Sequence, residues 1–119
     1  MKKQDFINLV NSAIDKLEKQ GEPCKGEYGN CVYLNDKNQC CIVGHMMPDD
    51  ETRKDADDCD FRVYGLFHYG MEWTKQFDKE QIKIMTSLQD DHDSFGVGFN
   101  AKIKTMREII AEYEAENDK

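Results

Sequence analysis

The sequence predicts an α+β fold, with one compact domain in which about three helices pack around a small antiparallel β-hairpin. Three observations predict it. Apolar residues recur at helical spacing in three separate stretches, two short β-prone runs flank a turn-forming stretch, and no internal repeat or low-complexity linker interrupts the 119 residues. A chain of this length can bury its core within a single domain, residues 1–119.

The first helix is expected over residues 5–20, with Gly21 as its C-terminal stop. Its apolar residues recur at steps of three and four and share one stripe that packs on a core: Phe6, Leu9, Val10, Ala13, Ile14 and Leu17. The stretch 22–30 contains a proline and two glycines and is predicted to be an irregular connection.

A β-hairpin is expected over residues 31–43. Its strands are the β-prone runs 31–34 and 39–43, and its turn is the stretch 35–38, whose residues tolerate left-handed backbone angles. This is the segment that makes the predicted fold α+β rather than all-helical.

The register of this hairpin depends on its loop. If Asn38 takes the left-handed position of a three-residue loop, Tyr33 lies opposite Cys41 and Cys31 lies opposite Val43. Both cysteines then share one face, and we expect this face to pack against the later helix that carries Gln89 and His92. Another loop length would reverse the faces.

The middle of the chain is less regular. Residues 49–60 hold seven acids and two bases and almost nothing apolar, which predicts a solvated loop or a short exposed helical turn. Residues 61–73 are rich in aromatic side chains but are interrupted by two glycines. A strand followed by a turn and a short buried helix remain open alternatives there.

Two further helices are expected over residues 78–92 and 100–114. Asp78 is a good N-cap for the first of them, and Gln81 three residues later completes a capping-box pair. Both stretches carry apolar residues near helical spacing: Ile82, Met85, Leu88, Ile103, Met106, Ile109, Ile110 and Tyr113.

The charge balance restricts the classes of partner. Sixteen basic residues against 24 acidic ones leave a formal net charge of -8, which opposes nucleic-acid binding and favours a basic protein partner. No run resembles a signal peptide or a membrane span, so a cytoplasmic location without membrane contact is expected. The odd number of cysteines, five, then predicts free thiols and no structural disulfide.

One candidate site is a cysteine nucleophile, Cys31 or Cys41, with His92 as base and Asp93 or Asp91 as the carboxylate that orients it. A thiolate needs a base within hydrogen-bonding reach and a third group that fixes the imidazole tautomer. Against this interpretation, an activated cysteine usually sits at a helix N-terminus, whereas both cysteines look like strand residues.

A metal site is a second candidate, with Cys31, Cys41, His45 and His92 as its chief ligands and Cys24, Cys40 and Cys59 in reserve. Structural zinc is usually marked by repeated close pairs of ligands, and that mark is absent. We therefore expect no cofactor, with zinc as the lesser alternative. A hard cation could use a third set, the carboxylates of Asp49, Asp50, Asp90, Asp91 and Asp93.

The fourth candidate is an interaction surface that needs no active site. Acidic side chains would steer the chain toward a basic partner, and aromatic ones are enriched where interfaces concentrate their binding energy. The candidates are Asp49, Asp50, Glu51, Asp55, Asp57, Asp58, Tyr64, Phe67, Tyr69 and Trp73. The same aromatic residues could instead fill the core.

Three short motifs follow one another along the chain: Cys31-x-Tyr33, then Cys41-x-Val43-Gly44-x-x-x-Pro48-Asp49, then Leu88-Gln89-x-x-His92-Asp93. In this order they resemble small proteins of tailed bacteriophages and prophages whose function is uncharacterised. The resemblance covers roughly residues 5–113. The chain departs from that pattern in having Leu34 where arginine is usual, Asn38 where glycine is usual, and an additional Cys40 and His45.

The resemblance implies a small phage-type accessory protein that acts in the bacterial cytoplasm. With the net charge and the lack of nucleotide-binding and serine-hydrolase motifs, it leads to the hypothesis of a non-enzymatic protein that binds a bacterial protein. It would inhibit or modulate a host or anti-phage defence component. The alternatives are a small Cys/His/Asp enzyme or metal-binding protein, and a structural or assembly factor of the virion.

Overall fold

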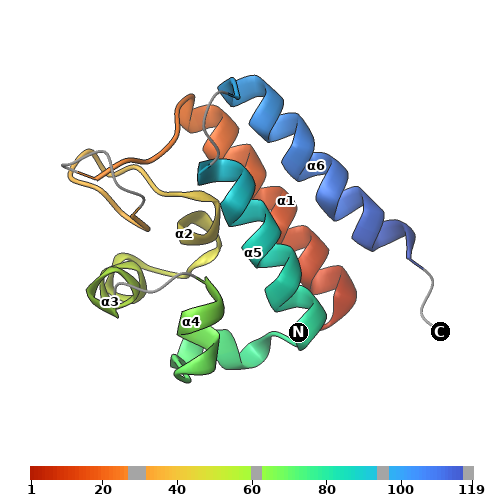
Figure 1. The fold of residues 1–119 in the computed structure, drawn as a ribbon, viewed down its shortest axis with the longest axis horizontal. Helices are drawn as coiled ribbons and strands as arrows, with labels where there is room; N and C mark the ends of the chain where they lie inside the picture. The colour runs from red at the N-terminus through yellow and green to blue at the C-terminus, as the bar shows by residue number, and fades with distance from the viewer. Residues whose placement is uncertain (27–31, 60–62, 94–96, 117–119) are drawn as a thin grey trace.

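The computed structural model describes residues 1–26, 32–59, 63–93 and 97–116 (Figure 1). Across these ranges it contains helices and no β-sheet, so the predicted α+β fold is wrong. The elements are α1 (Lys3–Gln20), α2 (Ile42–Met46), α3 (Asp50–Cys59), α4 (Val63–His68), the 3-10 helix η1 (Glu72–Gln76), α5 (Lys79–Asp93) and α6 (Phe99–Ala115).

The three long helices lie where the sequence predicts them, each within two residues of the expected ends. Gly21 ends α1 with a φ of 84° and donates its N–H to the Leu17 carbonyl. At the start of α5, Gln81 N–H donates to Asp78 Oδ1 at 2.8 Å and Asp78 N–H donates to Gln81 Oε1 at 3.0 Å. These two hydrogen bonds form the predicted capping box.

Helix α1 shares two packing partners, α2 and α6, with α5. It packs against α2 and α6, and α5 in turn contacts α2, α4 and α6 (Figure 1). Phe6 of α1 lies at the junction, with its ring edge-to-face against Phe77 at 5.9 Å and against Tyr113 of α6 at 5.5 Å. The core therefore lies between helices, and the described residues place no sheet beneath it.

In place of the predicted hairpin, the described part of residues 31–43 has a single antiparallel bridge, between Leu34 and Cys40. Asn38 takes the left-handed conformation, φ 62°, and this pairing belongs to the register in which Tyr33 lies opposite Cys41. The pairing does not extend, because the chain turns into α2 directly after Cys41. Cys31 lies outside the described residues.

Side chains from neighbouring helices satisfy the backbone here, which removes the need for more strands. The carboxylate of Asp57 in α3 accepts the N–H groups of Tyr33 at 2.7 Å and Leu34 at 3.1 Å. The side-chain amide of Gln20 in α1 accepts the Cys40 N–H at 3.0 Å and donates to the Cys40 carbonyl at 3.1 Å. Side chains of α1 and α3 thus provide hydrogen bonds that a neighbouring strand would provide in a sheet.

Helix α2 is short because both of its ends are capped. Cys41 Sγ accepts the Gly44 N–H at 3.3 Å at the N-terminal end. At the other end, Arg53 of α3 donates to the carbonyls of Gly44 at 2.6 Å and Met47 at 2.9 Å. Arg53 therefore connects α3 to α2.

The acidic run 49–60 is neither a loop nor a single turn, since residues 50–59 form the ten-residue helix α3. Asp49 begins it by accepting the N–H and the hydroxyl of Thr52 at 2.8 and 2.7 Å. In the unassigned aromatic stretch, α4 occupies Val63–His68, which is the short helix of the two alternatives.

Replacing Gly44 with alanine should destabilise the fold, because an added Cβ would lie 2.3 Å from the Tyr33 carbonyl oxygen. A backbone atom cannot move aside as a side chain can, so we expect a loss of about 1–3 kcal/mol in the free energy of unfolding. Urea denaturation would measure it. Gly98→Ala is the matched control, since no atom lies within 4 Å of an added methyl group there and a loss of only about 0.5 kcal/mol is expected at this N-cap position. Equal effects of the two changes would contradict the close approach.

Candidate functional site

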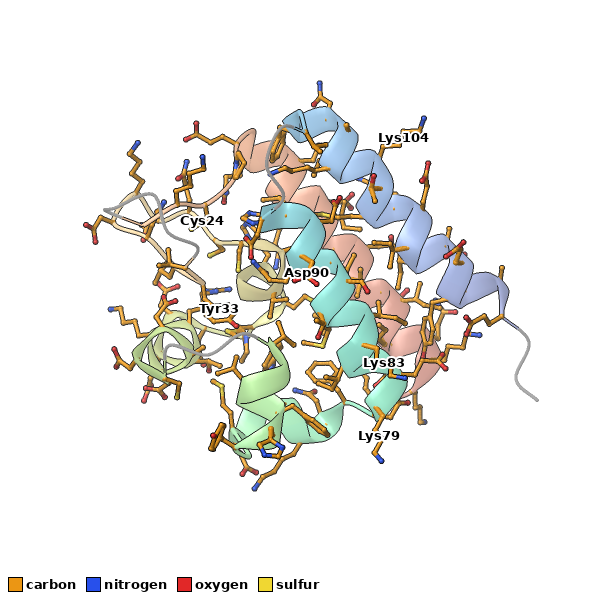
Figure 2. The ribbon with its side chains drawn as sticks, viewed as in Figure 1. Cys24, Tyr33, Lys79, Lys83, Asp90 and Lys104 are labelled. Atoms are coloured by element: carbon orange, nitrogen blue, oxygen red, sulfur yellow. The ribbon has the colours of Figure 1, made fainter. Side chains whose placement is uncertain are left out.

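The second and third sequence motifs converge in the structure. Val43 N–H at the start of α2 donates to Gln89 Oε1 of α5 at 3.4 Å, across 46 positions of the chain. Around this contact lies a group of side chains that we call the buried polar cluster: Cys24, Cys41, Gln89 and His92, which are buried, and Asp93, which is half-buried. Figure 2 shows Cys24 and Tyr33 on the side of α5 that faces α2.

His92 occupies the centre of the buried polar cluster and is only 2% exposed. Its Nε2 accepts the backbone N–H of Cys24 at 3.4 Å, and its Nδ1 lies 3.0 Å from Asp93 Oδ1. A neutral ring with its proton on Nδ1 satisfies both contacts. Gln89 Nε2 also donates to Asp93 Oδ1, at 3.1 Å, so the carboxylate holds two neighbours in place.

The thiols of this cluster are protonated and engaged. Burial raises the pKa of Cys41 well above its ordinary value, and the Gly44 N–H that the sulfur accepts opposes this only in part. Cys24 Sγ lies 3.1 Å from the Gln39 carbonyl oxygen, to which it donates. Burial, with the nearby acidic groups of Cys41 and Asp57, also raises the pKa of Tyr33 far above its usual range. Burial therefore favours the neutral forms of Cys41 and Tyr33 near neutral pH.

This geometry differs from that of a nucleophilic triad. A general base needs a free nitrogen within reach of the nucleophile, and His92 Nε2 is already occupied by a backbone N–H. An activated cysteine has a lowered pKa, whereas that of Cys41 is raised. The other predicted nucleophile, Cys31, lies outside the described residues. In the part of the chain that the structure describes, the cluster ties the Cys24 segment and α2 to α5.

His45 lies away from this contact. It sits in the last turn of α2, where its Nε2 lies 2.9 Å from Gln20 Oε1. Burial, assisted by the charges of Arg53 and Lys16 and by His92, lowers the pKa of His45 to about 4. Within the described ranges, no three His, Cys, Asp or Glu side chains gather in a way that could hold a metal ion.

The candidate carboxylates of a hard-cation site have other roles or separate positions. Asp49 caps α3, and Asp50 pairs with Arg53 at 2.7 Å. Asp90, Asp91 and Asp93 lie much later in the chain, in the last turns of α5, where Asp90 is exposed. Burial raises the pKa of Asp91, while the charge of Lys102 opposes that shift.

Lys102 makes a contact that the sequence pattern did not predict. It is only 7% exposed, and its ammonium donates to the His92 carbonyl at 2.7 Å, where it closes the C-terminal end of α5. Its position in α6 at helical spacing beside Ile103 and Met106 is the one available signal, because it places a lysine on the packed side of that helix.

The interaction-surface candidates divide into exposed and buried groups. Glu51, Asp55 and Asp58 of α3 are exposed, while Asp57 is half-buried against Tyr33 and Leu34. Tyr69 is 72% exposed, whereas Phe67 and Trp73 are half-buried against the core. Tyr64 lies in α4, and its side chain falls outside what the structure describes.

Comparisons with known protein families, with curated proteins and with solved structures find no match for this chain. Among the described helices, none combines the length and the apolar character that crossing a bilayer requires.

Thiol labelling should follow burial. Of the described cysteines, Cys59 is exposed and Cys24, Cys40 and Cys41 are buried. We expect iodoacetamide to alkylate Cys59 in the native protein and to reach Cys24 and Cys41 only after unfolding, because reaction requires an accessible thiolate. Peptide mass mapping over time would measure this. Rapid alkylation of Cys41 near neutral pH would instead indicate an activated nucleophile.

Stability should fall as the pH decreases from about 6.5 to about 4, in part because of His45. The ring titrates near 6.5 when unfolded and near 4 when folded, so the unfolded chain binds more protons in this window. His45→Gln keeps an amide beside Gln20 but cannot bind the proton. We expect the free energy of unfolding, measured by urea denaturation at a series of pH values, to decline less steeply with falling pH in this variant than in the wild type. Identical slopes would show that His45 is not held neutral.

Proposed function

We propose that this chain is a small acidic accessory protein that acts by binding another protein, through a surface formed by α3 and the exposed Tyr69. The observation that carries the proposal is the division of its polar groups. The candidate catalytic residues Cys41 and His92 are buried and hydrogen-bonded, while α3 presents exposed carboxylates to solvent.

The acidic face of α3 is held in a fixed position. Two of its polar residues point inward, because Arg53 caps α2 and Asp57 binds the backbone of residues 33–34. The outer side then carries four exposed acids: Asp50, Glu51, Asp55 and Asp58. A preorganised set of like charges favours encounter with a basic surface and costs little conformational entropy on binding.

An exposed aromatic residue follows α4, the next helix along the chain. Tyr69 is 72% exposed, and its ring meets that of His68 edge-to-face at 5.3 Å. Only three residues separate the end of α3 from the start of α4, so the chain itself keeps these two helices near each other. In the proposed surface, Tyr69 supplies the anchoring side chain and the α3 carboxylates steer the partner.

The resemblance to phage and prophage proteins supports the choice of partner. On that basis the partner is a bacterial protein with a basic surface, and the chain acts as an inhibitor or modulator of a host or anti-phage defence component. The enzyme alternative is less well supported, because Cys41 is a buried thiol with a raised pKa and His92 is engaged at both ring nitrogens.

The test is affinity capture from a bacterial lysate with the wild type and a charge-reversed variant, Glu51→Lys/Asp55→Lys/Asp58→Lys. We expect a stoichiometric partner that the wild type retains and the variant loses by about tenfold or more, since reversed charges repel a basic surface. The retained amount should also fall with salt, because exposed charges are screened beyond a Debye length of about 8 Å at physiological ionic strength.

The matched control reverses three exposed acids on other elements: Asp36→Lys/Asp90→Lys/Glu108→Lys. It changes the net charge equally, and we expect it to retain the partner. If both variants lose the partner to the same extent, net charge rather than the α3 surface is responsible. If no stoichiometric partner is captured by the wild type, the proposed function is wrong.

A further inference from the structure

A groove of about 290 Å³ runs along the seam between α5 and α6, on elements that the α3 surface does not include. Each helix lines it with residues spaced three, four and seven positions apart, which is one helical stripe. The lining residues are Glu80, Lys83, Ile84 and Ser87 from α5, and Ile109, Glu112, Tyr113 and Glu116 from α6 and its C-cap. Figure 2 shows Lys83 extending from α5 on the side toward α6.

The groove has an apolar stretch and an acidic end. Ile84 and Ile109 pack against the core yet remain partly exposed. The two helices run antiparallel after a short connection, so the start of α5 meets the end of α6 (Figure 1). Glu80, Glu112 and Glu116 therefore gather at one end, with Lys83 as the groove's single lining cation among the described residues.

The electrostatics of this end are unfavourable in the chain by itself. The carboxyl groups of Glu80 and Glu116 hydrogen-bond each other, and this contact with the nearby charges of Glu116 and Asp78 raises the pKa of Glu80. The last turn of α6 contains no basic residue to offset the negative end of its helix dipole. Lys3 compensates in part, since it donates to the Glu116 carbonyl and lies over the Tyr113 ring at 5.1 Å.

We infer that the α5–α6 groove is a docking site for a basic amphipathic helix of a partner protein. Its apolar residues would cover Ile84 and Ile109, and a lysine or arginine at one end would lie among Glu80, Glu112 and Glu116. Two antiparallel helices with an apolar seam accept a third helix in this way, through anchors at i, i+3 or i+4, and i+7. The acidic end sets both the charge of the partner helix and its direction.

This site is independent of the α3 surface, so the chain would present two acidic docking surfaces on different elements. One protein could then hold two basic partners, or two parts of one partner. The proposed function could fail while this inference holds, and the reverse is also true.

The probe is a synthetic helical peptide of about 18 residues, with leucines at i, i+3, i+4 and i+7 and lysines on the flanks. A scrambled peptide of the same composition keeps the charge and removes the apolar stripe. Fluorescence anisotropy would measure binding of both peptides to the full chain. We expect the scrambled peptide to bind at least about tenfold more weakly, because it cannot bury the two isoleucines together.

Two variants and one control locate the site. Glu80→Gln/Glu112→Gln/Glu116→Gln neutralises the acidic end without changing its shape, and Ile84→Ser/Ile109→Ser removes apolar area. Each variant should bind the amphipathic peptide about tenfold more weakly than the wild type does. The control, Glu51→Gln/Asp55→Asn/Asp58→Asn, removes three acids from α3 and should leave peptide binding unchanged. Circular dichroism checks folding, and the Gln variant decides the test if the Ser variant is unfolded.

Several results would overturn the inference. Equal binding of the amphipathic and scrambled peptides would mean that charge alone attracts them. If the α3 control loses as much affinity for the peptide as the groove variants do, the peptide binds elsewhere. If light scattering shows a dimer that the groove variants dissociate, a second copy of the chain occupies the groove instead of a partner helix.

Discussion

The backbone of residues 33–44 must find hydrogen-bond partners without a sheet, and the rest of the structure depends on how it does so. Side chains from three helices supply those partners: Gln20 of α1 at Cys40, Asp57 of α3 at Tyr33 and Leu34, and Gln89 of α5 at Val43. Because buried backbone groups are costly to leave unpaired, these three contacts determine where the helices dock. Gly44 packs closely on this segment, since an added Cβ there would lie 2.3 Å from the Tyr33 carbonyl oxygen.

The same arrangement separates neutral groups from charged ones. The Cys41 thiol, the phenol of Tyr33 and the His45 ring are wholly or partly buried, and burial shifts the pKa of each toward the neutral form. Most carboxylates lie outside, on α3 and along the end of the α5–α6 groove. In the proposed function, this acidic surface is the part of the chain that meets a basic partner.

The long helices could be predicted because their apolar periodicity and caps are local signals, as the Asp78–Gln81 capping box and Gly21 show. The absence of a full hairpin in the described residues could not be predicted. The left-handed Asn38 and the Leu34–Cys40 pairing nevertheless agree with the register expected for a three-residue loop. Whether a β-prone run becomes a strand depends on its partner, and here the partners are side chains distant in sequence. The convergence of the two motifs was predictable, but the burial of His92 and the role of Lys102 were not, since both depend on tertiary packing.

The three contacts to residues 33–44 span 20, 24 and 46 positions of the chain. This segment therefore has no autonomous stability, because each of these hydrogen bonds requires a helix that has already docked. Its amides should become protected from hydrogen exchange together with the helix interfaces and open with them as one cooperative unit. A segment that looks in sequence like the most local element of the fold thus depends on long-range hydrogen bonds.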